Sequence, residues 1–513
     1  MSSVLDEVLE GFEPSPQIVS VMAGARPATV LGLDIGTSGV RAALFDEQGV
    51  EIEDASVRLA RSALDDVTML DADDSVTLIA KAIDDVLERV TPHNLNIQLI
   101  SISCFWHSLI GVDAAGHAIT PVFTWAGTQA TDAAGELRKS FNERSIHGRT
   151  GCRFHPSYWP AKLSWLRKEQ PATFEATRQW MSFGEFLVLQ LFGASTASIS
   201  MASGTGLFNQ RTCEWDPELV EALELKPETL PKLSESHTTF QGMVQKYAQR
   251  WPQLSEAKLF PAIGDGAANA IGSGCTTRDS LALMVGSSGA LRLVYAGEPP
   301  DSLPPELWCY RADRQRVVLG GALSDGGNLY RWMRDSLLPS DDATSIERSL
   351  DLLEPDSHGL TILPFWSGER STSWSLTAKG AIAGLTNRSQ PIEILRAAME
   401  AIAYRFALVH RALTPFTAGA SVIASGTALR LSPVWIQILA DVLGLPITLS
   451  AHRESSTRGA ALLALEAAGK IANIEALNVA AGRTYEPDRS RHARYQAGLE
   501  RQEKLYQQLI SEI

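Results

Sequence analysis

The chain has 513 residues, which is too long for one ordinary hydrophobic core, so its length predicts two large domains. Apolar residues make up 45% of it and charged residues 20%, the balance of an ordinary globular protein. Because 59 acidic residues outnumber 45 Lys and Arg, the net charge is −14, and such a surface repels nucleic-acid phosphates and anionic lipids. We therefore expect neither nucleic acid nor a membrane as a partner.

The cysteines and the N-terminal segment exclude further classes of protein. The five cysteines are odd in number, widely spaced and form no Cys-x-x-Cys pair, which argues against a disulfide framework or a zinc site and suits a cytoplasmic protein. Residues 1–28 contain three prolines and no clear period, so we expect a poorly ordered leader. The uncharged stretches 96–112 and 186–210 contain too many polar residues for a membrane span.

The predicted elements of the first half are strands followed by a helix. Residues 30–35 and 40–45 are apolar runs on either side of a Gly-Thr-Ser-Gly turn, and residues 50–59 follow a second turn, which predicts an antiparallel meander. Apolar side chains at helical spacing predict a helix over 76–90. Residues 97–102 form a short β-branched run, typical of a buried strand. Strands followed by helices in a chain of this size predict a layered α/β architecture.

Helical patterns dominate the end of the chain. One helix is predicted over 391–413, with a proline in its first turn, where proline is tolerated. A second runs from about residue 432 to Gly444, and a third covers 457–469. Residues 496–510 are polar, so we expect a C-terminal helix on the surface.

A short segment occurs twice in the chain. Residues 33–39 read LDIGTSG and residues 283–289 read LMVGSSG, identical at four of seven positions and 250 residues apart. Two interpretations stay open at this point: two unrelated glycine-rich hairpins, or two similarly folded halves that face one ligand. The copies differ where the first has Asp34 and the second has Met284.

The first copy carries groups that suit phosphate binding. The backbone amides and hydroxyls of the turn can donate to phosphoryl oxygens, and its residues are Gly36, Thr37 and Ser38. Asp34 at the strand end could face a metal ion, and Arg41 could add a cation. A purely structural hairpin is the alternative. The sequence contains neither G-x-x-x-x-G-K-[ST] nor G-x-G-x-x-G, so phosphate binding would use paired hairpins.

Two further segments could contact a substrate. Asp265 lies between two glycines ahead of a helix of small residues, where its carboxylate could accept a proton from an attacking hydroxyl. The alternative is a plain Asp-Gly turn. Trp106 and His107 follow the strand over 97–102 and offer a flat face for sugar C–H groups and a donor for hydroxyls. For this pair the alternative is ordinary packing.

Together these segments resemble the FGGY carbohydrate kinases, a family with the duplicated actin-like (ribonuclease H-like) α/β ATPase fold. The resemblance runs from about residue 29 to residue 470. The matching segments are LGLDIGTSGVRAALFDEQG, GDGAANAIGSG, LMVGSSGALR, GGALSDGGNLYRWMRD, LPFWSGERS, ASGTALRLSPVWIQILADVLGLPI and ESSTRGAALLA.

The resemblance implies two duplicated domains with a cleft between them. The N-terminal domain, with the sugar site and a catalytic aspartate, is expected over 29–278, and the C-terminal domain, with the nucleotide site, over 279–475. Residues 476–513 are then a tail that contains a helix.

The resemblance also implies a role for individual residues, with ATP and Mg²⁺ as cofactors. The catalytic base matches Asp265, and the acidic residues near Mg²⁺, through water, match Asp34 and Asp265. Residues expected around the ATP phosphates and beside the nucleotide are Gly36, Thr37, Ser38, Arg41, Gly286, Ser287, Gly327, Gly426 and Thr427. Residues expected at the sugar are Trp106, His107, Asp265 and Gly266.

The identity of the sugar depends on the middle of the chain. Residues 148–174 and 201–209 look most like gluconokinases, whereas xylulokinases resemble the first hairpin equally well. Where the family usually has Trp-x-Asp-x-Arg, this chain has Gly127 and Gln129 in place of the acid and the cation. Losing a cation from a possible carboxylate pocket weakens the case for gluconate recognition. Thr427 stands in a segment where further glycines are usual.

We therefore expect an ATP- and Mg²⁺-dependent kinase that phosphorylates a terminal hydroxyl of a small sugar or sugar acid. Gluconate is the first expected substrate, and xylulose or another pentulose or polyol is the alternative. A catalytically silent sugar-binding regulatory protein of kinase ancestry and an ATPase of the chaperone or cytoskeletal type are rival classes. A cytoplasmic homodimer is expected.

Overall fold

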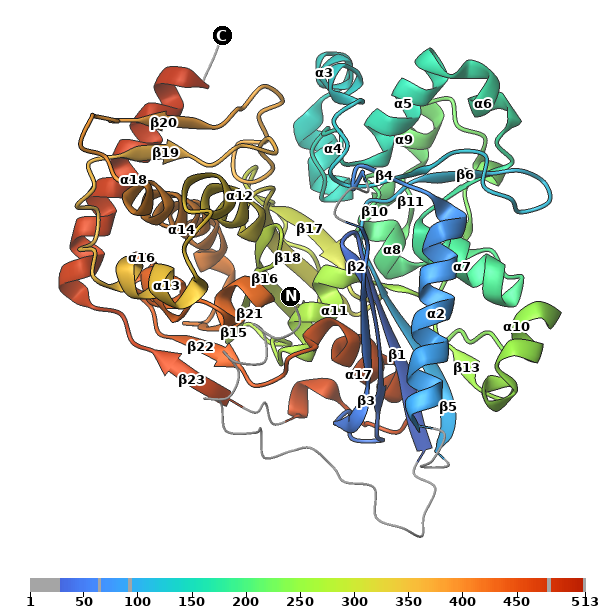
Figure 1. The fold of residues 1–513 in the computed structure, drawn as a ribbon. Helices are drawn as coiled ribbons and strands as arrows, with labels where there is room; N and C mark the ends of the chain where they lie inside the picture. Colours follow the sequence, from blue (N-terminus) through green and yellow to red (C-terminus); the bar gives the residue numbers. More distant parts are fainter. Residues whose placement is uncertain (1–27, 63–65, 91–94, 478–480, 511–513) are drawn as a thin grey trace.

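The two copies of the repeated segment form equivalent hairpins in two separate sheets. The structure is a computed structural model that describes residues 28–62, 66–90, 95–477 and 481–510 (Figure 1). In the first half, β1 (Ala28–Gly36) pairs antiparallel with β2 (Gly39–Phe45). In the second half, β15 (Ser280–Val285) pairs antiparallel with β16 (Gly289–Ala296). The leader expected over residues 1–28 lies outside the described residues, except that residue 28 belongs to β1.

Beyond the hairpin, the two sheets add strands in the same order and with the same parallel or antiparallel directions. The first sheet adds β3 (Glu51–Ala60), antiparallel to β2, and β5 (Asn96–Cys104), parallel to β1, followed by β13 (Lys258–Leu259) and β14 (Ile263–Gly264), both parallel to β5. The second sheet adds β18 (Arg316–Leu323), antiparallel to β16, and β21 (Ser421–Ser425), parallel to β15, followed by the parallel β22 (Ile447–Ser450). Its edges are β17 (Trp308–Arg311) and β23 (Ala481–Tyr485). The predicted antiparallel meander and the duplicated actin-like α/β fold are therefore confirmed.

Helices and short strands surround the two sheets. The helices of the first half are α2 (Ala72–Val90), α3 (Thr131–Ser140), α4 (Glu143–Thr150), α5 (Trp159–Glu169), α6 (Pro171–Ala176), α7 (Phe183–Phe192), α8 (Ile199–Ser203), α9 (Pro217–Ala222), α10 (Gln245–Arg250) and α11 (Asp265–Gly272). Those of the second half are α12 (Gly327–Leu337), α13 (Ala343–Asp351), α14 (Pro391–Leu413), α15 (Thr427–Arg430), α16 (Pro433–Leu443), α17 (Ser455–Ala467) and α18 (Arg489–Leu509). The short strands are β4 (Met69–Leu70), β6 (Ile110–Val112), β7 (Val122–Phe123), β8 (Gln179–Met181), β9 (Thr196–Ser198), β10 (Phe208–Asn209), β11 (Glu214–Trp215), β12 (Lys232–Ser234), β19 (Thr361–Leu363) and β20 (Ala381–Ala383).

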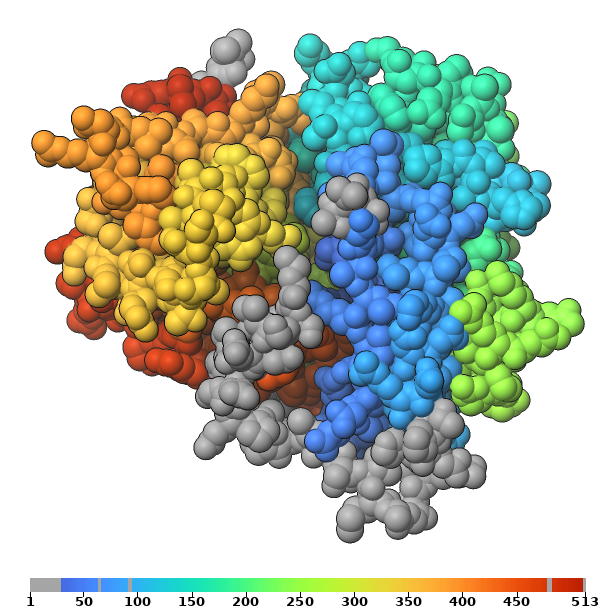
Figure 2. Space-filling view, in the orientation of Figure 1, coloured from blue at the N-terminus to red at the C-terminus, as the bar shows by residue number. Residues whose placement is uncertain are grey.

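The two halves lie side by side, and a furrow separates them on the face shown in Figure 2. The blue and cyan first half forms one wall of this furrow, and the yellow and orange part of the second half forms the other. No helix among the described residues combines the length and apolar character needed to cross a bilayer. The domain boundaries expected at residues 278 and 475 stay predictions.

The predicted helices form, and the last one is more deeply anchored than expected. α14 has the predicted bounds, and α16 stops where Gly444 adopts the left-handed conformation with φ 67°. The C-terminal helix begins earlier than predicted, at Arg489, and is not merely a surface helix, because Tyr495 and Leu499 are 0% and 2% exposed. A narrow apolar stripe in an otherwise polar segment buries these two side chains against the second core.

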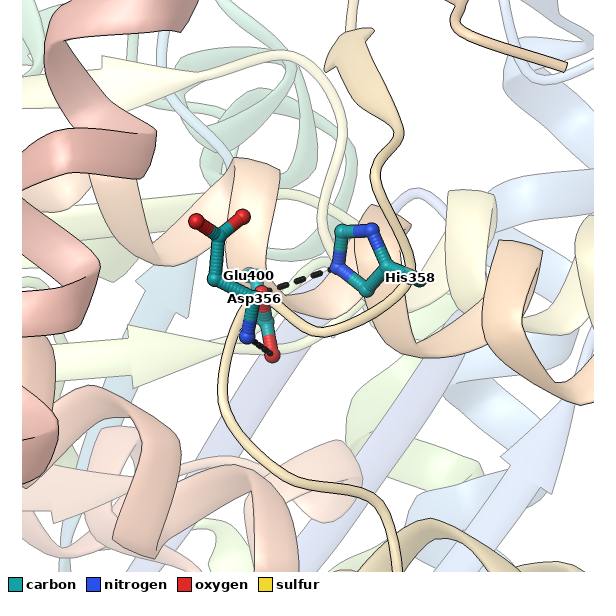
Figure 3. Close-up of side chains that lie close together, drawn as sticks. All are labelled: Asp356, His358 and Glu400. Carbon is teal, nitrogen blue, oxygen red and sulfur yellow. Dashed lines mark hydrogen bonds and ion pairs between the residues drawn. The ribbon is translucent and has the colours of Figure 1, made fainter.

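A polar cluster beneath α18 contains three potential metal ligands, Asp356, His358 and Glu400 (Figure 3). Each already has partners in the protein. The carboxylate of Glu400 accepts hydrogen bonds from Arg396 Nε at 2.7 Å and from His358 Nε2 at 3.0 Å. Asp356 forms an ion pair with Arg501 of α18. Because these cations already balance the carboxylates, we interpret the cluster as a set of hydrogen bonds and ion pairs that holds α18 in place, and not as a metal centre.

Two helices pack between the sheets and connect the halves. α17 belongs to the second half of the chain but packs on β1 and β5 of the first sheet, whereas α11 belongs to the first half and also contacts β16 of the second sheet (Figure 1). Their backbones touch: a Cβ added at Gly459 would lie 1.8 Å from the carbonyl oxygen of Ala268, and one at Gly272 would lie 1.7 Å from that of Ser455. Only glycine permits this approach at both positions.

We expect Gly459→Ala to lower the free energy of unfolding by about 1–3 kcal/mol, because the added methyl group overpacks the contact between α11 and α17. Gly148→Ala is the matched control, since Gly148 is a helical glycine with no atom near its Cβ position. That variant should gain about 0.5–1 kcal/mol from helix propensity alone. Urea unfolding followed by circular dichroism measures both changes. A Gly459→Ala protein as stable as the parent would contradict the proposed helix contact.

Candidate functional site

The first hairpin presents a buried carboxylate that three neighbouring strands hold in place. Asp34 lies near the end of β1, opposite Arg41 in the β1–β2 register and opposite Ser103 in the β1–β5 register. Its carboxylate accepts a hydrogen bond from Arg41 Nη1 at 2.7 Å and another from Ser103 Oγ at 2.7 Å. Thr37 and Ser38 form the turn that follows, and Ser38 is exposed. The strand pairing therefore places Asp34 and Arg41 directly below a turn whose donors are accessible.

The second hairpin meets the start of α12 and the segment before α15. The backbone amides of Gly327 and Asn328 donate to the carbonyl oxygens of Gly286 and Ser287 at 2.9 and 3.0 Å. Gly426 has φ 99°, and a Cβ on it would lie 2.3 Å from the carbonyl oxygen of residue 285. The residues expected at the nucleotide from three segments of the second half are therefore neighbours in space, and the exposed Thr427 directly follows Gly426.

Asp265 is the first residue of α11 and faces the first hairpin. It follows β14, whose Gly264 is paired with the end of β5, so Asp265 and Asp34 leave the same edge of the first sheet. The residue as a whole is half-buried. Desolvation of its carboxyl group raises the pKa of Asp265 to about 6; Arg292 opposes this rise, whereas the charge of Asp34 adds to it. A carboxyl group with such a pKa is suited to accept and release a proton near neutral pH.

Trp106 and His107 form an aromatic wall beside Asp265. The indole Nε1 of Trp106 donates to the carbonyl oxygen of Ser200 at 2.9 Å, and Nδ1 of His107 donates to that of Gly204 at 2.5 Å. Both side chains are buried, and Trp106 packs edge-on against Tyr310 of the second half, with ring centroids 5.0 Å apart. Burial lowers the pKa of His107 to about 3, so this side chain is neutral. A Cβ added at Gly266 would lie 2.7 Å from the ring of Trp106, so Trp106 is the member of the pair next to Asp265 and Gly266. The contact of the pair with a sugar stays a prediction.

Sequence reasoning missed two arginines that the second half contributes to this region. Arg292 lies on β16 and is 7% exposed, and a Cβ added at Gly266 would lie 2.7 Å from its Nε. Arg370 follows β19 in the chain and is 8% exposed. Arg292 could have been recognised as a single charge inside the apolar run GALRLVYA, because a charged side chain in a buried strand requires a functional or structural reason.

The unusual residues after Trp125 also lie beside this region. The side chain of Gln129 folds back over Gly127, so that a Cβ at Gly127 would lie 2.6 Å from Gln129 Oε1. The guanidinium group of Arg370 stacks on the ring of Trp125, 4.6 Å from its centroid. A cation from the second half therefore lies over the segment in which Gln129 stands in place of a cation.

The fold and the site together define the class of protein. Two halves share one topology, each half has a glycine-rich hairpin, and an aspartate of raised pKa lies between them. This is the duplicated actin-like ATPase architecture. A family model for the N-terminal domain of the FGGY family of carbohydrate kinases matches residues 29–272, and one for the C-terminal domain of that family matches residues 294–468. The chain belongs to the FGGY family of carbohydrate kinases and is an ATP-dependent carbohydrate kinase.

Several relatives and solved structures are similar over most of the chain. A gluconokinase of Bacillus subtilis (strain 168) is 28% identical over 470 residues, which cover 89% of this chain and 91% of the relative. The structure of gluconate kinase from Lactobacillus acidophilus has a TM-score of 0.85 at 27% identity and covers 95% of this chain and 99% of its own. A ligand-bound xylulose kinase from the same organism also has a TM-score of 0.85 at 27% identity, covering 94% of this chain and 98% of its own.

We expect the carboxyl group of Asp265 in the ligand-free protein to be half protonated near pH 6, which ¹³C NMR can measure with Asp265→Asn as the assignment reference. The charged and titratable groups that face it are Asp34, Arg292, Arg370 and Cys104. Asp34→Asn removes a negative neighbour and should lower the pKa, whereas Arg292→Met removes a positive one and should raise it. A pKa near that of an ordinary aspartate would contradict the described surroundings.

Proposed function

We propose that the protein transfers the γ-phosphoryl group of ATP to a terminal hydroxyl of a sugar acid, with gluconate as the substrate and Asp265 as the general base. The single observation that supports this most is the position of Asp265 at the start of α11. There it faces Asp34 of the first hairpin, Arg292 of the second sheet and the aromatic wall of Trp106. A base in that position can contact a hydroxyl on the sugar side while the phosphates lie on the hairpin side.

The proposed reaction uses groups from both halves. The carboxylate of Asp265 accepts the proton of the substrate hydroxyl as that oxygen bonds to the γ-phosphorus. The bond from this phosphorus to the bridging oxygen then breaks, and ADP leaves. Backbone amides and hydroxyls of residues 36–38 and 286–287 donate to the phosphate oxygens, and Arg41 adds positive charge. Gly327, Gly426 and Thr427 lie beside the nucleotide.

The residues present also suit a magnesium ion. Asp34 and Asp265 leave the same sheet edge, and the charge of Asp34 raises the pKa of Asp265, so a divalent cation near both carboxylates would relieve their repulsion. Their oxygens can accept further hydrogen bonds from metal-bound water, because a carboxylate has about four acceptor sites. When bound, Mg²⁺ would neutralise charge that develops on the phosphates.

We propose gluconate and not xylulose as the substrate for two reasons: the similar proteins include gluconokinases, and Arg292 and Arg370 lie on the proposed sugar side. The similar proteins include a gluconokinase and a gluconate kinase, but also a xylulose kinase at equal structural similarity. Xylulose therefore stays the second candidate. The cytoplasmic location and the homodimer expected from the sequence stay predictions, and the free and buried state of all five cysteines agrees with the former.

The test of this proposal is a coupled ADP-release assay with gluconate, xylulose, ribulose, glycerol and related polyols, each with and without Mg²⁺. We expect turnover with gluconate that exceeds turnover with each other compound and that EDTA abolishes. Saturation with xylulose at higher kcat/KM would replace gluconate by the second candidate. Sugar binding without ADP release for every compound would favour the silent regulatory protein, and ADP release without any sugar would favour the ATPase class.

For the catalytic base, we expect Asp265→Asn to reduce kcat by at least about 100-fold, within the range of about 10²–10⁴ for loss of a general base, while ATP still binds. Asp54→Asn is the matched control: Asp54 is exposed on β3, and its positive φ of 56° suits asparagine. Steady-state kinetics and calorimetric titration with ATP measure the two effects. Near-normal turnover of the Asp265→Asn enzyme would exclude Asp265 as the base.

A further inference from the structure

We propose that Arg292 and Arg370 form an anion subsite that binds the carboxylate of the substrate, so that these two residues select a sugar acid over a neutral sugar. The inference rests on the proposed function, because it names the groups that recognise the end of the substrate remote from the reacting hydroxyl. The arginines come from the second half of the chain, whereas Asp265 and the aromatic wall come from the first.

The first argument is that both guanidinium groups are buried without a full set of partners. Nε and Nη1 of Arg292 and Nε of Arg370 are buried, and within the described part of the chain no group accepts a hydrogen bond from them. Nη2 of Arg370 donates to the carbonyl oxygen of Leu323 at 2.9 Å. Asp265 is the acidic neighbour of both arginines but accepts no hydrogen bond from these three atoms. Burying guanidinium donors without acceptors is unfavourable, so the arrangement suits a further anionic ligand.

The second argument is that the two cations lie close enough to affect one another. Burial lowers the pKa of Arg292 to about 10, and the neighbouring charge of Arg370 contributes to this, whereas Asp265 opposes it. Asp265 is close enough to Arg292 to oppose this lowering of its pKa, but no carboxylate among the described residues accepts a hydrogen bond from Nε or Nη1 of Arg292. An anion between two buried guanidinium groups would relieve both their repulsion and their desolvation, and a carboxylate matches the planar fork of an arginine.

The third argument concerns which side of the site the arginines occupy. Arg292 lies on the same face of β16 as Ala290 and Val294, which belong to the core cluster of the first half. It lies three residues, or about 10 Å, along the strand from the hairpin at Gly289. Its neighbours are Gly266 and Tyr310, which belong to the proposed sugar side. A carboxylate on the sugar therefore fits this position better than a phosphate of ATP.

The fourth argument concerns the remaining titratable groups of the sugar side. Besides the two arginines it contains the buried Lys162, whose Nζ donates to the carbonyl oxygen of His107 at 2.6 Å and whose pKa burial lowers. Burial lowers the pKa values of His107 and His155, so both imidazoles are neutral. Tyr158 and Tyr310 are joined by a hydrogen bond of 2.5 Å between their hydroxyl groups, and burial raises both of their pKa values, so they carry no charge either. An aldonate offers one carboxylate to the arginines and hydroxyls to the wall.

The test compares two substrates that differ only at the proposed contact: gluconate and glucitol, which has a CH₂OH group in place of the carboxylate. The full-length protein and its Arg292→Met, Arg370→Met and Arg292→Lys variants are assayed for kcat/KM with each. In Arg292→Met and Arg370→Met we expect the ratio of kcat/KM for gluconate to that for glucitol to fall about 10- to 100-fold, as for loss of a charge-assisted hydrogen bond. Arg292→Lys should retain part of the preference.

The matched control is Arg388→Met, which removes the same charge from an exposed loop after β20 and should leave the ratio unchanged. Thermal unfolding of the ligand-free proteins checks that the variants fold. Arg292→Met should melt at or above the temperature of the parent, because it removes a buried cation that lacks a partner. Gluconate should raise the melting temperature of the parent and not that of Arg292→Met.

The outcomes separate this inference from the proposed function. An equal fall of kcat/KM for gluconate and glucitol in Arg292→Met would overturn the inference, because it would place the arginine at the phosphates common to both reactions. Better turnover of a neutral pentulose by the parent would also overturn it. If no sugar is phosphorylated, the proposed function fails, but calorimetric binding of gluconate to the parent and its loss in Arg292→Met would still support the anion subsite.

Discussion

The structure depends on the backbone contact between α11 and α17. α17 leaves its own half and packs on the first sheet, α11 contacts both sheets, and glycines at positions 272 and 459 let the two backbones touch. Since α11 begins with Asp265, the helix that connects the halves also carries the proposed base. The same contact keeps β16, with Arg292, opposite the edge of the first sheet. A residue with a side chain at either glycine would separate the helices and thereby the groups that must act together.

Electrostatics in this protein is organised locally. The chain as a whole carries a charge of −14, yet Arg41 lies at the first hairpin, and Arg292 and Arg370 are buried beside the aromatic wall. Arg41 is balanced by Asp34, whereas the other two are buried with donors that have no acceptor among the described residues. Burying guanidinium donors without acceptors lowers the stability of the free protein and becomes favourable only when an anion binds. A loss of stability in exchange for ligand binding is expected at a functional site.

Much of the fold could be predicted because the local patterns were strong. The apolar runs around GTSG, the helix over 391–413 and the stop at Gly444 all depend on neighbours in the sequence, and the structure reproduces them. The burial of one side of α18 was not predicted, because only Tyr495 and Leu499 form its apolar stripe within a polar segment. Arg292 was missed because its burial depends on strands far away in the chain. The proposed roles of the predicted site residues, although these residues lie together, stay predictions.

The sequence by itself determined the family, the two similar hairpins and the identity of the aspartates, because these depend on residue types at short spacing. It also determined the acidic balance that excludes a general affinity for phosphate. Only the tertiary structure decided which residues share one site. Strand register placed Ser103 and Arg41 on Asp34, and the packing of two sheets against α11 and α17 brought Arg292 and Arg370 to the aromatic wall. Contacts between residues of different elements arise from packing and register, which no local pattern specifies.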